Sequence, residues 1–191
     1  QLQKVKNNTT KEQPKKIETG IEIRLDMSEN PVKPIYLGIG SNLGNKKRNI
    51  ENTKSNLLKN NINILECSSY YESLSWPNPK NPKFLNIVVK IKTHLTPLKL
   101  IKKCKEIETR LGRKKMPKNS PRVCDIDIID FKNQRMENDL ILPHPRMHTR
   151  NFVLLPLFEI DKDWKHPVLK LNIKKLISSL SNSDIRSIKQ I

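Results

Sequence analysis

The spacing of hydrophobic residues along the chain alternates between strand-like and helix-like patterns, and this predicts the secondary structure. In predicted helices, apolar residues recur every three or four positions, whereas in predicted strands they alternate with polar ones or form short runs. Ile50, Thr53 and Leu57, for example, share one helical face, and Phe84 and Asn86 share one strand face. The predicted elements are a strand over 35–40, a helix over 46–60, strands over 62–71 and 84–93, a helix over 97–111 and a strand over 123–131.

This order of elements is βαββαβ, the ferredoxin-like arrangement. We therefore predict an α+β fold whose antiparallel sheet packs two helices on one face and leaves the other face for a ligand. Residues 1–33 are polar and lack periodicity, which predicts a flexible N-terminal extension. Residues 34–191 are predicted to form one folded domain, with a short strand over 140–142, an apolar helix over 152–160 and a small C-terminal α/β extension.

The helix over 97–111 carries a charge in an unfavourable place. Thr96 is its predicted N-cap, Pro97 lies in its first turn, and Gly112 ends it. Glu108 falls near the C-terminus, where the helix dipole disfavours an anion unless a cation pairs with it. A cation paired with Glu108 would remove this penalty.

Two carboxylates lie next to each other on the last predicted strand. Alternation places Asp125 and Asp127 on one face, with Cys124 and Ile126 on the other. Such carboxylates are roughly 6.6 Å apart along the backbone, and by leaning together they can share hard cations such as Mg²⁺. A solvated strand face is the alternative. Arg122 favours the metal site, because its planar fork suits a phosphate that bridges two metals.

Cationic residues occur on both sides of this strand. The stretch 113–118 has four cations among six residues, which is typical either of a solvated loop or of a basic lid that closes over a triphosphate. Cations also stand at alternate positions after the strand. Because alternating cations seldom serve as core, we expect these residues to contact phosphate, and they are His144, Arg146, His148 and Arg150.

The strand over 84–93 carries a candidate binding surface for a flat heterocycle. Phe84 offers a ring for stacking, and Asn86 beside it offers a donor and an acceptor for the edge of the heterocycle. A core aromatic is the alternative for Phe84. The turn Gly40-Ser-Asn-Leu-Gly44 imitates a dinucleotide-binding turn, but Leu43 stands where that fingerprint needs its third glycine, so we reject a Rossmann site.

The charge of the chain narrows the class of partner. The 191 residues carry a net charge of +18, and residues 1–33 hold seven Lys or Arg and five Asp or Glu, which leaves +16 on residues 34–191. A basic folded domain favours an anionic partner, either nucleic acid or a polyphosphate nucleotide. A general lysine-rich composition is the alternative.

The cysteines and the lengths of the apolar runs indicate the cellular compartment of the protein. The three cysteines lack the paired spacing of a disulfide framework or a zinc site. No apolar run reaches the ~18 residues that a bilayer span needs, and residues 1–26 contain no hydrophobic core of a signal peptide. We therefore predict a cytoplasmic protein without a membrane partner.

Three separated motifs together resemble one enzyme family. They are Pro121-Arg-Val-Cys-Asp-Ile-Asp-Ile-Ile129, Leu142-Pro-His-Pro-Arg146 and Arg150-Asn-Phe-Val-Leu-Leu-Pro-Leu-Phe-Glu159. The chain from residue 35 to the 160s is similar to 6-hydroxymethyl-7,8-dihydropterin pyrophosphokinases of folate biosynthesis. The resemblance implies transfer of the β,γ-pyrophosphoryl unit of ATP to the pterin hydroxymethyl group, with release of AMP and with two Mg²⁺ ions. It also implies a ferredoxin-like fold.

The resemblance assigns roles to residues at matching positions. The implied metal ligands are Asp125 and Asp127, which act in catalysis with Arg113 and Arg122. The implied ATP contacts are Lys115, Arg122, Ile128, Leu140, Ile141, His144 and Arg150. The implied pterin contacts are Ser73, Leu74, Trp76, Phe84, Asn86 and Phe152, with Phe152 as the second wall of a sandwich opposite Phe84. Either aspartate is a candidate to accept the hydroxyl proton.

A single-stranded RNA-binding module is the rival interpretation, since a basic ferredoxin-like sheet with a strand aromatic also describes an RNA recognition motif. Such a module needs several aromatics on neighbouring strands, and the chain offers chiefly Phe84. It also leaves Asp125 and Asp127 unexplained, because carboxylates repel phosphates unless a metal intervenes. We therefore expect a monomer with ATP and a pterin as partners and no nucleic acid.

Overall fold

The computed structural model of the protein describes residues 33–191, except positions 115 and 118, so the predicted extension over 1–33 lies outside the described residues apart from Lys33. The first elements are β1 Ile35–Ser41, α1 Lys46–Lys59, β2 Asn63–Cys67, β3 Tyr71–Ser73, β4 Phe84–Lys92, α2 Pro97–Arg110 and β5 Asp125–Phe131. The later elements are the 3-10 helix η1 Met147–Thr149, α3 Asn151–Ile160, α4 Ile173–Ser178, α5 Asn182–Arg186 and β6 Lys189–Gln190.

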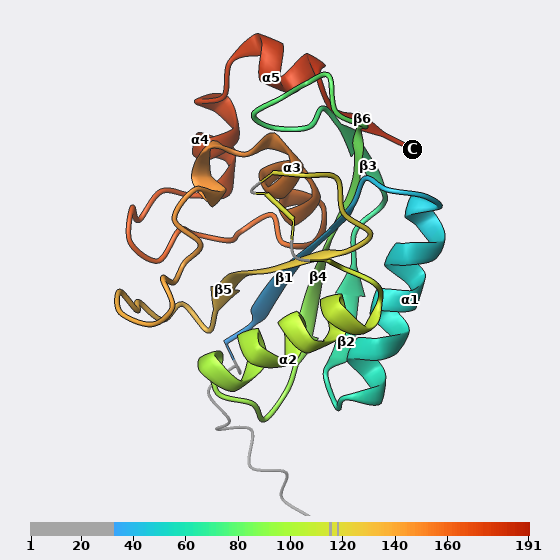
Figure 1. Ribbon diagram of the computed structural model, residues 1–191. Coiled ribbons are helices and arrows are strands. Elements are labelled where there is room, and N and C mark those ends of the chain that lie inside the picture. The colour runs from blue at the N-terminus through green and yellow to red at the C-terminus, as the bar shows by residue number, and fades with distance from the viewer. Residues whose placement is uncertain (1–32, 115, 118) are drawn as a thin grey trace, which may run out of the picture. The chain divides into compact units, whose positions relative to one another are not determined.

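Within the described residues, the strands form one six-stranded antiparallel sheet (Figure 1). The order is β5-β1-β4-β3-β6, and β2 pairs with β4 beside β3. The long strand β4 therefore connects both halves of the sheet. This arrangement confirms the predicted α+β, ferredoxin-like fold.

The predicted strand over 62–71 is wrong as one element, because the structure divides it into β2 and β3. The Ser68 hydroxyl replaces a backbone carbonyl and accepts a hydrogen bond from the Val88 N–H at 3.0 Å. The next amide, Ser69 N–H, donates to the Glu159 carboxylate of α3 at 3.1 Å instead of to β4. The ladder is interrupted there, and an alternating pattern does not reveal such side-chain substitutions.

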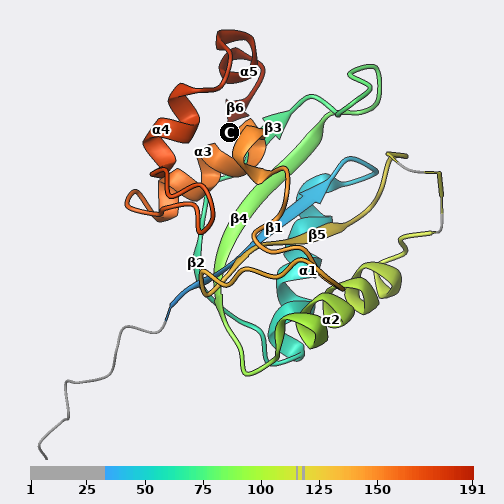
Figure 2. The same cartoon turned by 90° about the vertical axis from the view of Figure 1, so that its left-hand side faces the viewer.

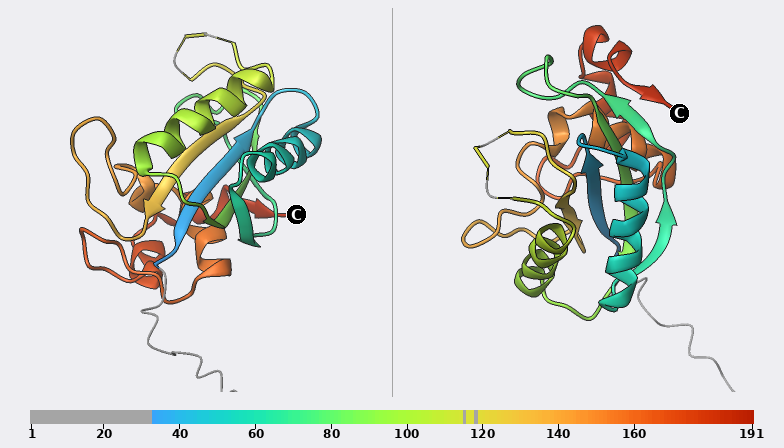
Figure 3. Two further views of the ribbon diagram at one scale, coloured as in Figure 1. Left: turned by 90° about the horizontal axis from the view of Figure 1, so that it is seen from below. Right: turned by 45° about the vertical axis from the view of Figure 1, so that its right-hand side comes forward.

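Helices cover the two faces of the sheet unequally (Figures 2 and 3). Helices α1 and α2 lie side by side on one face, and their buried residues pack with Leu37, Ile39 and Ile126. On the other face, α3 and α4 pack with Tyr36 and Val88. Alternation along β1 explains the separation, since neighbouring residues point to opposite faces. The part of the second face that α3 leaves uncovered holds the cavity described below.

The segment after β5 differs in part from its prediction. The expected strand over 140–142 is wrong, because only Leu142 pairs there, in an isolated bridge with Met136. Pro143 follows directly and has no N–H with which to continue a ladder. The predicted apolar helix is confirmed as α3, and the C-terminal extension is confirmed as α4, α5 and β6. No helix in the described part of the chain is long and apolar enough to cross a membrane.

Polar side chains are buried beneath α3 and α4. Asp130 accepts a hydrogen bond from Trp164 Nε1 at 2.9 Å, and burial raises the pKa of its carboxyl to about 6. The ring of His166 accepts at Nδ1 from the N–H groups of Val168 and Leu169, at 3.2 and 3.1 Å. Burial, together with the neighbouring His148, lowers the pKa of His166 to about 4.

We predict that acidification destabilises the wild-type protein more than the His166→Asn variant. The pKa of His166 falls from 6.5 to about 4 on folding, so its contribution is complete above about pH 6.5 and is lost as the pH falls toward 4. The loss should reach about 2 to 3 kcal/mol. Asparagine keeps an acceptor for the two loop amides and does not titrate.

Urea unfolding of both proteins between about pH 7 and 4 measures the difference. Asp130 has a raised pKa, so its titration changes stability in the opposite direction. This change occurs in both proteins and cancels when their stabilities are compared. Stability curves that stay parallel over this range would contradict the prediction.

Candidate active site

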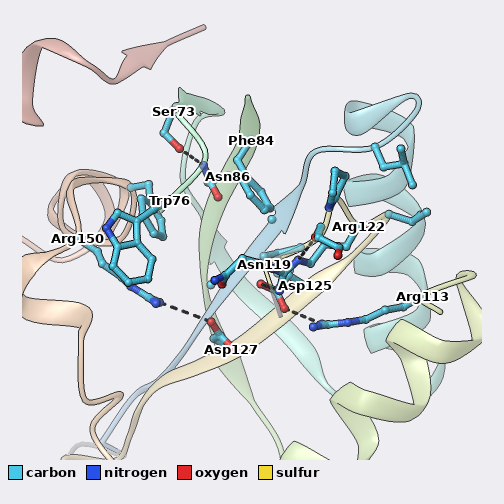
Figure 4. Close-up of a pocket in the computed structure, with 18 of the residues that line it drawn as sticks. Ser73, Trp76, Phe84, Asn86, Arg113, Asn119, Arg122, Asp125, Asp127 and Arg150 are labelled. Carbon is cyan, nitrogen blue, oxygen red and sulfur yellow. Dashed lines mark hydrogen bonds and ion pairs between the residues drawn. The ribbon is translucent and has the colours of Figure 1, made fainter. Parts of the chain in front are cut away.

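A cavity of about 620 Å³ opens beside the ends of β1, β4 and β5 (Figure 4). Its floor is formed by the middle strand, where Gly40 pairs with Asn86 of β4 on one side and with Asp125 of β5 on the other. The cavity gathers most of the residues proposed from the sequence. Those that line it are Ser73, Leu74, Trp76, Phe84, Asn86, Arg113, Arg122, Asp125, Asp127, His144, Arg150 and Phe152.

Three residues of the predicted ATP set lie elsewhere in the described part of the chain. Ile128 is buried in the core below α1 and α2, because it lies on the opposite strand face from Asp127. Leu140 packs against that same core, and Ile141 is exposed outside the cavity lining. Lys115 lies outside the described residues. Of the alternating cations, His148 does not line the cavity and instead packs edge-on against His166.

The aromatic end of the cavity depends on a close approach of two strands. A Cβ atom on Gly40 would lie 3.0 Å from Asn86 Oδ1 and 3.3 Å from Phe84 Cδ1, so a larger residue here would displace one of these two side chains. The Asn86 amide donates to Ser73 Oγ at 2.9 Å and to the Tyr71 carbonyl at 3.4 Å. Asn86 is therefore buried with its orientation set, and its Oδ1 remains to accept a hydrogen bond from a ligand.

The carboxylate end is surrounded by cations. As predicted, Asp125 and Asp127 share one face of β5, with Cys124 and Ile126 buried on the other. Asp125 forms ion pairs with Arg113 at 2.6 Å and with Arg122 at 3.1 Å.

The second carboxylate has two looser cationic neighbours. Asp127 Oδ2 lies 3.8 Å from Arg150 and 3.9 Å from His144 Nε2. Burial lowers the pKa of His144 despite the opposing charge of Asp127, so its ring is neutral at neutral pH. Burial and the nearby Arg146 also lower the pKa of Arg150, although a guanidinium remains charged in proteins.

Glu108 has cationic partners that offset the penalty of its helix position. Its side chain is only 2 % exposed and pairs with Arg113 at 2.6 Å and Lys105 at 2.8 Å. Burial lowers the pKa of Arg113, but Asp125 and Glu108 outweigh this effect and hold it above its usual value. Glu108 also accepts from the Ile126 N–H at 2.7 Å, between the two aspartates. It thereby fastens the end of α2 to the strand that carries them.

Asn42 helps to hold the site together and was not predicted from the sequence. It is 2 % exposed, and its Nδ2 donates to Ser75 Oγ at 3.2 Å and to the Pro82 carbonyl at 3.1 Å. Its Oδ1 accepts from the Arg122 N–H at 2.7 Å. Asn42 therefore ties the turn after β1 to both loops that border the cavity. The only signal in the sequence was its place within the glycine-rich turn.

Comparison with known proteins identifies the family of this chain. Residues 36–162 match the model of the 7,8-dihydro-6-hydroxymethylpterin-pyrophosphokinase (HPPK) family. The chain belongs to this family. Among individual members, the 2-amino-4-hydroxy-6-hydroxymethyldihydropteridine pyrophosphokinase of Aquifex aeolicus is 37% identical over 142 residues, which cover 74% of this chain and 88% of that protein.

Other relatives are much longer than this chain. The folic acid synthesis proteins of Pneumocystis carinii and Dictyostelium discoideum are 35% and 40% identical, over 84% and 78% of this chain. The match spans 22% of the length of each of them. Membership of the HPPK family favours the predicted pyrophosphokinase over the RNA-binding module.

Solved structures show the same fold. A crystal structure of HPPK-DHPS in complex with substrates superposes with a TM-score of 0.65 at 17% identity, covering 83% of this chain and 46% of that one. The wild-type HPPK-DHPS of Plasmodium falciparum superposes with a TM-score of 0.60 at 17% identity, covering 76% of this chain and 44% of that one.

Asn42→Ala is expected to lower the free energy of unfolding by about 2 to 4 kcal/mol, because the buried Asn42 side chain makes three hydrogen bonds that alanine cannot replace. Asn52→Ala, at an exposed position of α1, is the matched control and should change stability by at most about 0.5 kcal/mol. Urea unfolding measures both. A wild-type midpoint for Asn42→Ala would show that the turn holds its neighbours by other means.

Proposed function

We propose that the protein transfers the β,γ-pyrophosphoryl unit of ATP to the hydroxymethyl group of 6-hydroxymethyl-7,8-dihydropterin and releases AMP. One observation carries the proposal: a single cavity joins a half-buried aromatic and a buried amide to two carboxylates ringed by cations. The names of the relatives point to the same reaction. Substrates, cofactors and residue roles below are parts of this proposal.

The aromatic end suits a pterin. Its flat ring would stack on Phe84, with Phe152 as the opposite wall, and both rings line the cavity. Asn86 would accept a ring N–H at Oδ1, because its own hydrogens are directed to Ser73 and Tyr71. Leu74 and Trp76 border the same end and would close the edge of the pocket.

The carboxylate end suits Mg²⁺. Carboxylate oxygens are the ligands that this ion prefers, and both aspartate side chains line the cavity with about a quarter and a third of their surface exposed. Asp125 and Asp127 would hold two ions. The ions would neutralise charge on the triphosphate while it reacts.

The arginines around the carboxylates would exchange partners when ATP binds. Arg113 and Arg122 now pair with Asp125, and Arg150 lies near Asp127. A triphosphate offers these guanidinium groups stronger bidentate acceptors and leaves the carboxylates free for metal. His144 would donate to a phosphate oxygen, and Lys115 is proposed to join from the basic loop.

The main task of the protein in this transfer is placement. A pterin stacked on Phe84 would direct its hydroxymethyl group toward the carboxylates, since Asn86 and Asp125 lie on opposite sides of Gly40. Holding the hydroxyl in line with the β-phosphorus removes much of the entropic barrier. Either Asp125 or Asp127 would accept the hydroxyl proton.

Asp125→Asn and Asp127→Asn should each reduce turnover at least about 100-fold, because each removes a charge that holds metal at the reacting phosphates. The measurement is AMP formation from Mg-ATP that depends on 6-hydroxymethyl-7,8-dihydropterin. Asp163→Asn, at an exposed position outside the cavity, is the control for loss of a carboxylate. Melting curves verify folding. Near-normal turnover of either variant at saturating Mg²⁺ would exclude the two-metal assignment.

Asn86→Ala should weaken pterin binding by about 1 to 3 kcal/mol, since the ring loses a hydrogen-bond partner inside the cavity. Affinity for a non-hydrolysable ATP analogue should change little, because the carboxylate end keeps its residues. Calorimetric titration with each ligand separates the two effects. Equal losses for both ligands would mean that Asn86 supports the fold rather than the pterin.

A further inference from the structure

The C-terminal segment, residues 181–191, contacts two parts of the domain that carry pterin-site residues. It comprises α5 and β6, and it lies beside β3 at the end of the molecule where α3 begins (Figure 1). Helix α5 has no buried residue, and both residues of β6 are exposed. The segment therefore gains little free energy from buried apolar surface.

The first contact is with β3. Strand β6 pairs antiparallel with it, Gln190 opposite Tyr71 and Lys189 opposite Glu72, and the Ile191 N–H donates to the Tyr70 carbonyl at 2.9 Å. On its other side, β3 pairs with β4 and supplies the two acceptors that orient the Asn86 amide. With only three residues, β3 depends on both neighbours for its place in the sheet.

The second contact is with the first residue of α3. Asn151 Nδ2 donates to the Asp184 carbonyl at 2.5 Å and to Ser187 Oγ at 3.0 Å, while its Oδ1 accepts from the Phe152 N–H at 2.7 Å. Helix α3 has no side-chain cap on its preceding residue, Arg150. Asn151 therefore connects the start of α3, where the second aromatic wall lies, to the C-terminal segment.

The packing beneath the segment is loose, so these hydrogen bonds are needed to hold it in place. Between these two contacts, a second hollow of about 420 Å³ lies beside the segment, lined by Tyr71, Leu155, Phe158, Ile185 and Ile188 among others. Apolar contact alone therefore does not hold the segment closely against the domain.

We propose that Asn151 is a positioning residue for pterin binding and that the C-terminal segment is the support that holds both Asn151 and β3. The proposal rests on the proposed function, since it concerns Phe152 and Asn86 as the two sides of a pterin pocket. Arg150 also has a contact outside this support, because its guanidinium lies 3.8 Å from Asp127. The support should therefore affect the pterin more than the triphosphate.

The test compares variants along this connection. Asn151→Ala removes all three hydrogen bonds and should weaken pterin binding about 5- to 20-fold. Ser187→Ala removes one acceptor from outside the cavity and should weaken it about 2- to 5-fold. The double variant should resemble Asn151→Ala, because the two residues share one interaction. Ser178→Ala is the matched control, since this serine bonds only within its own helix, to Lys175.

Each protein, as the full chain, is titrated with 6-hydroxymethyl-7,8-dihydropterin at saturating Mg²⁺ and non-hydrolysable ATP analogue, and separately with the analogue alone. Affinity for the analogue should stay within about twofold of wild type in all variants. Linkage requires that pterin in turn strengthen the support. Hydrogen exchange at the Ile191 amide should therefore slow when pterin is added to the complex with the analogue, and this slowing should be lost in Asn151→Ala.

Unchanged pterin affinity in Asn151→Ala, or an equal loss for pterin and the ATP analogue, would overturn the proposal. A pterin effect on exchange that is the same in wild type and Asn151→Ala would do so as well. If wild type itself binds no pterin, the proposed function fails. If wild type binds it and the variants bind equally well, only the role of Asn151 and its support fails.

Discussion

Two neighbouring carboxylates on β5 require compensating groups, and the rest of the site supplies them. Asp125 and Asp127 repel each other, and four cationic or polar groups from three separate segments surround them: Arg113, Arg122, His144 and Arg150. The loops that carry these four residues must therefore run close enough to β5 for each side chain to reach the two aspartates. Guanidinium groups also suit phosphate, so the same side chains that neutralise the two aspartates could contact the triphosphate of the proposed reaction.

Glycine at the centre of the sheet lets the two ends of the cavity meet. Because Gly40 lies between Asn86 and Asp125 in the register, no side chain rises between the pocket for a flat ring and the carboxylates. A larger residue would contact Asn86 Oδ1 and the Phe84 ring. Neighbouring strands are about 4.8 Å apart, so the backbones of Asn86 and Asp125, two strands apart, lie about 10 Å from each other. This separation suits the proposed pterin, whose hydroxymethyl group would point toward Asp125 and Asp127.

Buried polar residues hold the loops around this floor. Glu108 joins the end of α2 to the backbone between the two aspartates, and Asn42 joins the turn after β1 to the loops on both sides of the cavity. Both are nearly inaccessible and fully hydrogen-bonded, and in such surroundings the loss of one partner is costly. The loops can therefore be irregular and polar while their ends stay in place.

The sequence by itself determined the βαββαβ order, the shared face of Asp125 and Asp127 and the need for a cation beside Glu108. These follow from periodicity and helix polarity, which act between residues a few positions apart. Only the tertiary structure decided that Asn42 meets Arg122, 80 residues away, and that the chain between β2 and β3 turns toward Glu159. Hydrogen bonds between distant segments depend on how the elements pack, and the local pattern of apolar and polar residues carries no record of that packing.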